Sequence, residues 1–137
     1  MRDLVLYMHI IAGILIIVLS IFILRNIQAK PKWLKQASLL TAAISWIMIV
    51  PSGILYRVFY PATKTLIKAG TWPWAHSIVM ETKEHWGLLI PVIATVAAGL
   101  VYSGRLKESK KWWILLIVVA LLIGVMGRTV VLGGMKG

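Results

Sequence analysis

The residues of this chain best suited to hold a redox cofactor or a metal ion are its histidines, His9, His76 and His85. The sequence contains no cysteine, so disulfides, thiolate metal sites and haem attached through a C-x-x-C-H motif are excluded. Any cofactor therefore needs histidine, methionine, carboxylate or arginine ligands. No nucleophile with a supporting base is recognisable, so we assign no catalytic residues. This favours an electron-transfer or accessory subunit over a stand-alone enzyme.

Helical phase distinguishes His76 from His85. Nine positions separate them, which places them on opposite faces of an unbroken helix at about 100° per residue. His85 shares its face with Glu81 and with an apolar stripe formed by Leu88, Val92, Val96 and Gly99. We therefore expect His85 to point into the protein and His76 to be an interfacial hydrogen-bonding residue.

A pair of imidazoles from facing helices, with cations nearby, is what a non-covalent b-type haem needs. His9 and His85 are the candidate axial ligands, and Gly13, one turn after His9, offers a small face where a flat ligand can approach the backbone. The candidate partners of the haem propionates are Arg57, Lys83 and Arg128. The sequence thus predicts one haem b near the outer face of a membrane.

The segment around His9 also resembles a known family. Residues 8–13, Met-His-Ile-Ile-Ala-Gly, follow Leu-Val-Leu-Tyr and give a His-apolar-apolar-small-Gly pattern. This pattern resembles the first helix of small membrane b-type cytochromes of the cytochrome b561-like kind. The resemblance implies a b-type haem and electron transfer. Members of that family usually carry ligand pairs near both membrane faces, whereas this chain has no histidine near the inner side, so at most one bis-histidine haem is expected.

A metal ion is the alternative occupant of these residues. Glu81 and His85 are four positions apart and share a helix face, and His9 would complete a set of two histidines and one carboxylate, with His76 as a substitute. Such a set suits copper, iron or zinc.

Composition places the chain in a membrane. Its 137 residues are 60% hydrophobic, well above the roughly half expected of a soluble protein. The mean hydropathy is +0.88. The net charge of +11 comes mainly from residues between apolar runs, with no continuous basic face, so nucleic-acid binding is not expected and the lipid bilayer is the expected partner. Nothing marks a second domain within residues 1–137.

Four apolar runs, at about residues 4–24, 37–56, 84–103 and 112–132, each have about the 20 residues that a helix needs to cross the hydrocarbon. The sequence therefore predicts an all-α integral membrane protein, a four-helix up-down-up-down bundle. Residues 57–83 are expected to form an outer loop with one short interfacial helix, Pro61 to Ala69, and Pro91 to kink the third helix.

Helical faces predict which polar residues point into the bundle. Besides His9 and Gly13, Ser20 lies on the same face of the first run. The expected inward residues of the other runs are Thr41, Ser45, Ser52 and Tyr56 on the second and Gly124 and Arg128 on the fourth.

The distribution of basic residues predicts the orientation. The first and third loops are rich in lysine and arginine and should be cytoplasmic, which puts both termini outside a cell membrane. The basic residues of these loops are Arg25, Lys30, Lys32, Lys35, Arg105, Lys107, Lys110 and Lys111. The aromatic residues expected to anchor the cytoplasmic interface are Trp33, Trp112 and Trp113.

Two functions fit these features. The first is a small membrane haem-binding protein that transfers electrons within an oxidase or quinol-handling assembly. The second is a non-enzymatic accessory subunit, which the small size and high apolar content favour. Both imply partners in the membrane, either other subunits or further copies of this chain.

Overall fold

The computed structural model describes residues 1–136, and within that range all regular structure is helical. In chain order, the elements are α1 (Arg2–Asn26), α2 (Leu34–Ile47), α3 (Ile49–Ile54), the π-helical turn η1 (Leu55–Phe59), α4 (Tyr60–Ala69), the π-helical turn η2 (Ala75–Met80), α5 (Glu81–Gly87), α6 (Leu89–Tyr102) and α7 (Leu106–Met135).

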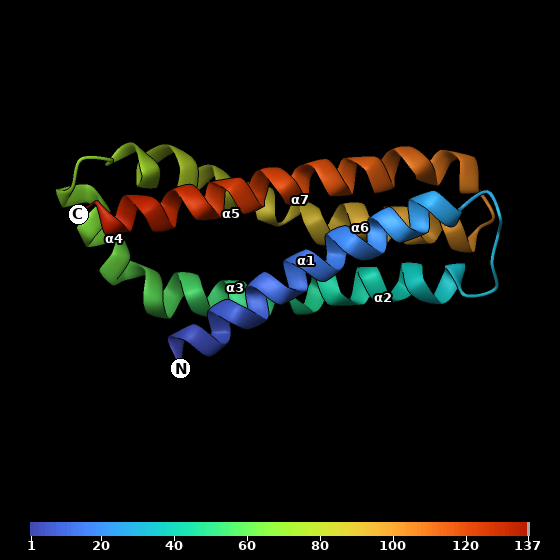
Figure 1. The fold of residues 1–137 in the computed structure, drawn as a ribbon, viewed down its shortest axis with the longest axis horizontal. Coiled ribbons are helices and arrows are strands. Elements are labelled where there is room, and N and C mark those ends of the chain that lie inside the picture. Colours follow the sequence, from blue (N-terminus) through green and yellow to red (C-terminus); the bar gives the residue numbers. More distant parts are fainter. Residues whose placement is uncertain (137) are drawn as a thin grey trace.

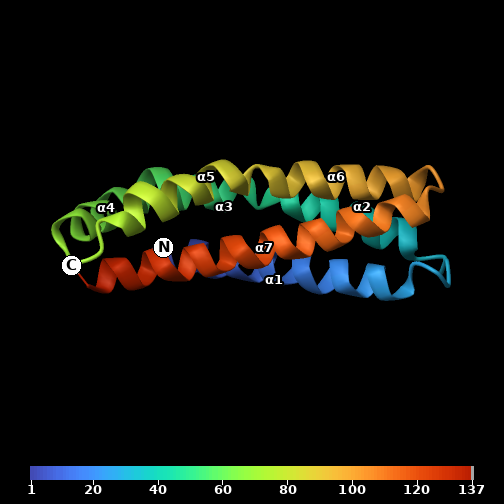
Figure 2. The same cartoon turned by 90° about the horizontal axis from the view of Figure 1, so that it is seen from above.

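These elements join into four long helices, Arg2–Asn26, Leu34–Ala69, Ala75–Tyr102 and Leu106–Met135, each long and apolar enough to cross a membrane. The four expected apolar runs fall one on each helix. Successive helices run in opposite directions, which confirms the all-α up-down-up-down bundle (Figures 1 and 2). We call the end with the loops at residues 27–33 and 103–105 the basic end, and the end with the turn at residues 70–74 the hairpin end.

Residues 57–83 differ from the expected outer loop, because almost all of them are helical. The expected short helix exists as α4 and ends at Gly70 as predicted, but it continues the helix before it without a break. Pro61 does not interrupt that helix because the preceding turn widens, and the Tyr60 N–H bonds to the Leu55 carbonyl in a π-type turn. The resulting 36-residue helix is about 54 Å long and extends well beyond a hydrocarbon core of about 30 Å.

Prolines produce the two interruptions within the long helices. Helix α2 ends before Met48, three residues ahead of Pro51, and α5 ends before Leu88, three residues ahead of Pro91. Proline has no N–H and its ring crowds the carbonyl four residues earlier, so the regular ladder fails there. The expected irregularity at Pro91 is confirmed, and Pro51 causes an equivalent one in the neighbouring helix.

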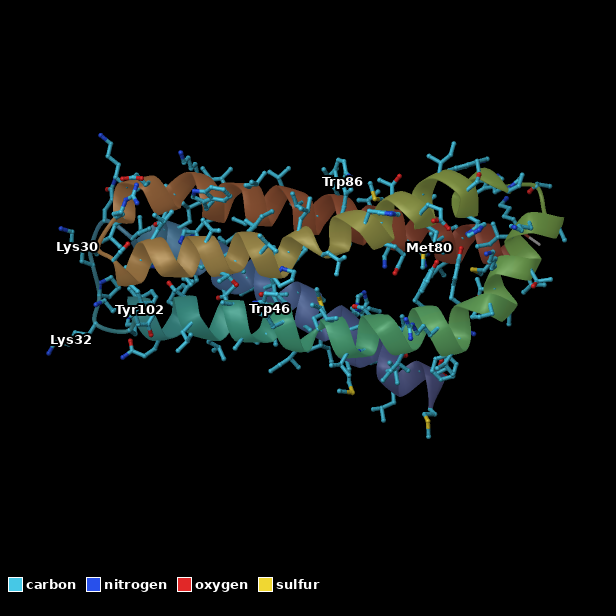
Figure 3. The ribbon with its side chains drawn as sticks, turned by 180° about the vertical axis from the view of Figure 1, so that it is seen from behind. Lys30, Lys32, Trp46, Met80, Trp86 and Tyr102 are labelled. Atoms are coloured by element: carbon cyan, nitrogen blue, oxygen red, sulfur yellow. The ribbon has the colours of Figure 1, made fainter. Side chains whose placement is uncertain are left out.

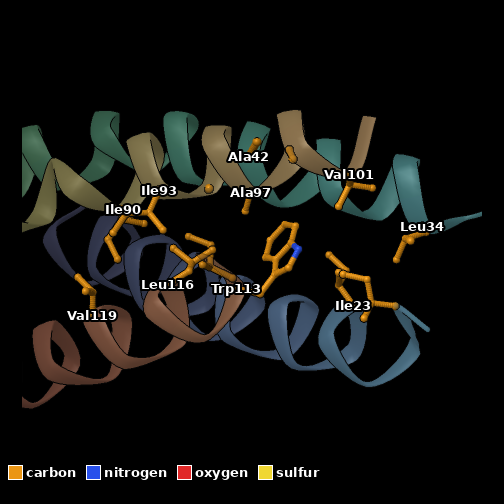
Figure 4. Packing of buried hydrophobic residues seen from close by; sticks show 14 residues of the cluster. Ile23, Leu34, Ala42, Ile90, Ile93, Ala97, Val101, Trp113, Leu116 and Val119 are labelled. Atoms are coloured by element: carbon orange, nitrogen blue, oxygen red, sulfur yellow. The ribbon is translucent and has the colours of Figure 1, made fainter. Parts of the chain in front are cut away.

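The core consists of two clusters. In the basic half, Trp113 of α7 is fully buried against the alanines of α6, among them Ala94 and Ala97 (Figure 4). Trp113 was expected at the interface, but the small α6 residues leave room for its indole inside, where its Nε1 has no hydrogen-bond partner within residues 1–136. The second cluster lies at the hairpin end and consists of Tyr60, Ile67, Ala75, Met80 and Val130.

The helix contacts change along the bundle. In the basic half, α1, α2, α6 and α7 form a closed ring of neighbouring pairs. Toward the hairpin end, α7 packs against η2, α4 and α5, whereas α1 stays with α3 and η1. Helix α1 makes no contact with α5 in the described chain.

Gly133 allows α7 to pack against the hairpin. A Cβ at Gly133 would lie 2.8 Å from the Cβ of Ala75, whereas a Cβ at Gly124 would meet nothing within 4 Å among the described residues. We expect Gly133→Ala to lower the free energy of unfolding by about 1–3 kcal/mol, because neither backbone can yield easily. The matched variant Gly124→Ala should be neutral or stabilising by up to about 1 kcal/mol. Thermal unfolding in detergent measures both, and equal midpoints would contradict this packing.

Candidate functional site

His9 is held by α3 in a defined tautomer. Its ring is half-buried, and its Nδ1 lies 2.9 Å from the Ser52 hydroxyl oxygen. That hydroxyl has one proton, which it donates to the Met48 carbonyl at 2.7 Å. Ser52 must therefore accept from His9, so Nδ1 carries the hydrogen and Nε2 of the neutral imidazole carries a lone pair. Both residues lie on the inward faces predicted from helical phase.

His85 points away from the bundle, so its expected inward position is wrong. The residue is exposed, as are Leu88, Val92 and Gly99 of the same stripe. The buried face of this helix instead runs through Met80, Ile90 and Ala94. In a membrane an apolar stripe can face lipid, so hydrophobicity alone does not mark the interior. The His85 Nδ1 lies 2.6 Å from the Glu81 carbonyl and donates to it, which also leaves Nε2 with a free lone pair.

His76, expected at the interface, is the most buried histidine, with 5% of its surface exposed. Its Nδ1 lies 2.9 Å from the Tyr60 hydroxyl, and its Nε2 lies 3.8 Å from a carboxylate oxygen of Glu81. Tyr60 stacks on Tyr56, with ring centroids 5.6 Å apart. These contacts fix His76 in the second core cluster as part of a Tyr–His–Glu chain across the hairpin.

The three candidate cations are placed differently. Arg57 and Arg128 are exposed, so the expected inward position of Arg128, with that of Gly124, is wrong. Lys83 is half-buried and crosses to α7, where its Cε lies 3.4 Å from the position of a Cβ at Gly127. Among the three, Lys83 alone is directed into the bundle.

The structure does not bring His9, Glu81 and His85 together. Helices α1 and α5 are not in contact, and residues 1–136 contain no group of three or more histidine, aspartate or glutamate residues that could hold a metal ion. One chain therefore presents one inward imidazole with a free Nε2, at His9. Next to it, a Cβ at Gly13 would meet no atom within 4 Å among the described residues, so there is space on this face of α1.

The sequence predicts some residues of this site and not others. The predicted inward face of the second helix is confirmed, since Thr41 and Ser45 are buried, and the same prediction identifies Ser52 as an inward residue. The Tyr60–His76 pair does not follow from the sequence, which predicts a loop around both residues. No family model matches the chain, and no curated protein or solved structure is significantly similar to it.

The Tyr60–His76 hydrogen bond should stabilise the hairpin. Tyr60→Phe removes the hydroxyl and leaves the buried Nδ1 of His76 without its partner, so we expect a loss of about 1–3 kcal/mol in the free energy of unfolding. Tyr56→Phe is the matched control, because the Tyr56 hydroxyl makes no hydrogen bond within the described chain. Denaturant or thermal unfolding would show the difference, and an equal effect of both variants would refute the role of this bond.

Proposed function

We propose that the protein is a haem-binding subunit of a membrane electron-transfer assembly, with one b-type haem toward the outer face and His9 as an axial ligand. The observation that carries this proposal is the hydrogen bond from His9 Nδ1 to Ser52, which leaves the Nε2 lone pair free. Histidines that ligate metals are commonly fixed in this way by a second hydrogen bond. A bound haem would supply one-electron transfer to an oxidase or a quinol-handling partner.

The remaining residues fit such a haem only in part. The open space at Gly13 leaves room beside His9, and Lys83 offers an inward cation for a propionate. His85 has a free Nε2 but faces outward, so it does not complete a pair with His9 in the same chain. We therefore propose that the second axial ligand comes from a neighbouring subunit, and that His85 serves a neighbour in the same way if the assembly is a homo-oligomer.

The proposed orientation follows from the basic end. Its loops carry lysine and arginine at high density, which favours a cytoplasmic position. Both termini and the hairpin end would then lie outside a cell membrane, with His9 toward the outer face.

The absorbance spectrum of the protein, purified from haem-sufficient cells with its associated subunits, tests this proposal. We expect a Soret band that His9→Ala abolishes, because the axial nitrogen is lost. His76→Ala should retain the band, since both ring nitrogens of His76 already face partners. In a homo-oligomer, His85→Ala should convert a six-coordinate spectrum into a five-coordinate one. Absence of a Soret band from the wild-type protein would overturn the haem proposal.

The role of Ser52 gives a sharper test with a matched control. Ser52→Ala removes the acceptor that fixes the His9 tautomer, and loss of such a contact typically weakens metal binding about 10–100-fold. Ser45→Ala removes a buried hydroxyl that bonds only to carbonyls of its own helix. Haem titration should therefore show weakened binding for Ser52→Ala and wild-type binding for Ser45→Ala. Equal affinities of the two variants would exclude this role of Ser52.

The second candidate is a cofactor-free accessory subunit. The exposed face with Leu88 and Val92 favours it, since such a face can pack on a larger membrane subunit as well as on lipid. Co-purification with larger subunits, without haem and without copper, iron or zinc by elemental analysis, would support this function instead.

A further inference from the structure

The basic end contains a hollow surrounded by lysines. It has a volume of about 270 Å³, and Lys30, Lys32 and Lys35 line it together with the apolar residues Leu34, Val101 and Leu106. The three lysines come from the loop between α1 and α2 and from the first turn of α2, and their side chains are exposed. The hollow thus combines positive charge at its rim with an apolar floor.

A second hollow lies in the groove between α2 and α6. It has a volume of about 310 Å³ and is lined by Leu39, Ala42, Thr95, Ala98, Gly99 and Tyr102. Small residues make the groove, and a Cβ at Gly99 would meet no atom within 4 Å among the described residues. Trp46 marks its far end, where the indole Nε1 donates to the Thr95 hydroxyl at 2.9 Å.

The two hollows are neighbours. Val101 lines the first and Tyr102 the second, and the Lys35 Nζ lies 5.6 Å from the centroid of the Tyr102 ring. Figure 3 shows Tyr102 close to the loop that carries Lys30 and Lys32, with Trp46 farther along the bundle. From Tyr102 to Thr95 the groove follows α6 for about 10 Å, at 1.5 Å per residue.

We propose that the two hollows form a binding site for one anionic glycerophospholipid. The lysines bind the phosphate, and the upper part of an acyl chain lies in the groove between Tyr102 and Trp46. Basic pockets between transmembrane helices on the cytoplasmic side are a known type of site for acidic headgroups. An apolar groove leading from such a pocket into the hydrocarbon matches a lipid better than it matches a soluble anion.

The backbone at Lys30 is consistent with a bound ligand. Lys30 has a φ of +47° and is the one non-glycine residue with positive φ in the part of the chain that the structure describes. A left-handed conformation is unfavourable for a lysine, and such strain is often retained at ligand sites. Glycine would fit this position without strain, but it would remove one of the three positive charges at the hollow.

Lipid binding by charge variants tests the headgroup part of the site. The probes are phosphatidylglycerol and phosphatidylcholine, added to the full chain in detergent and detected as bound mass by native mass spectrometry. We expect the triple variant Lys30→Gln, Lys32→Gln and Lys35→Gln to bind phosphatidylglycerol about a hundredfold more weakly. The matched triple variant Lys64→Gln, Lys68→Gln and Lys136→Gln removes the same charge from the hairpin end, far from both hollows (Figure 1), and should change binding less than about threefold.

A second pair of variants tests the groove. Gly99→Leu fills open space in the groove and should weaken phosphatidylglycerol binding about tenfold, because the acyl chain loses its contact surface. Gly124→Leu adds the same side chain at an open, exposed position of α7 and should leave binding unchanged. The glycine variants carry no lysine substitution. They therefore still test the proposal if circular dichroism shows that the lysine triple variant is misfolded.

Three outcomes would overturn the proposal. The first is equal loss of binding in the two triple variants, which would mean that total charge and not this hollow attracts the lipid. The second is displacement of phosphatidylglycerol by millimolar inorganic phosphate, which would assign the hollow to a free anion. The third is equal binding of phosphatidylglycerol and phosphatidylcholine by the wild-type protein.

Discussion

The need to satisfy polar groups inside an apolar bundle is the constraint on which this structure depends. Lipid offers no hydrogen bonds, so a buried hydroxyl must find its partner within the protein. Ser20, Ser38, Thr41 and Ser45 each donate to a carbonyl three or four residues earlier in their own helix. The side chains are small and their hydroxyls are satisfied within their own helix, so neighbouring helices can approach closely at these positions. The same rule gives Ser52 its different role, because its proton is used in its own helix while its oxygen still accepts from His9.

The arrangement of the bundle can largely be predicted from the sequence, because the backbone polar groups of a chain that crosses lipid must also be satisfied within the protein. A helix that crosses lipid must be apolar over about 20 residues, and only helices or closed barrels can cross, so four apolar runs specify four helices. The structure of the segment between the second and third runs cannot be predicted by this argument. Once the chain leaves the hydrocarbon, water relaxes the requirement for apolar residues, and the mixed polar and apolar composition of residues 57–83 is compatible with either a loop or a helical hairpin. Packing of Ile67 and Ala75 against α7 stabilises the helical hairpin.

The positions of the candidate site residues can also be predicted from the sequence only in part. The inward faces of His9 and Ser52 follow from helical phase, because small and polar residues share those faces. The direction of His85 does not follow, since a stripe of apolar residues has two favourable environments in a membrane protein, the bundle and the lipid. The Tyr60–His76 pair joins residues 16 positions apart across a turn, so no local pattern reveals it. Its bond depends on the widened turn at Leu55–Phe59, which carries the helix past Pro61.

The second long helix connects all of these features. Its first part contributes Leu39 and Ala42 to the groove beside α6, while its inward face carries the hydroxyls that bond to their own backbone. After the interruption ahead of Pro51 it presents Ser52 to His9, and farther on it presents Tyr60 to His76. An interruption of the backbone ladder gives a helix a place where its direction can differ on the two sides. Ser52 lies beyond this interruption, so the packing of α2 against α6 does not by itself fix its position. The hydrogen bond between Ser52 and His9, with the contacts of α1 to α3 and η1, fixes the half of the helix that carries the site.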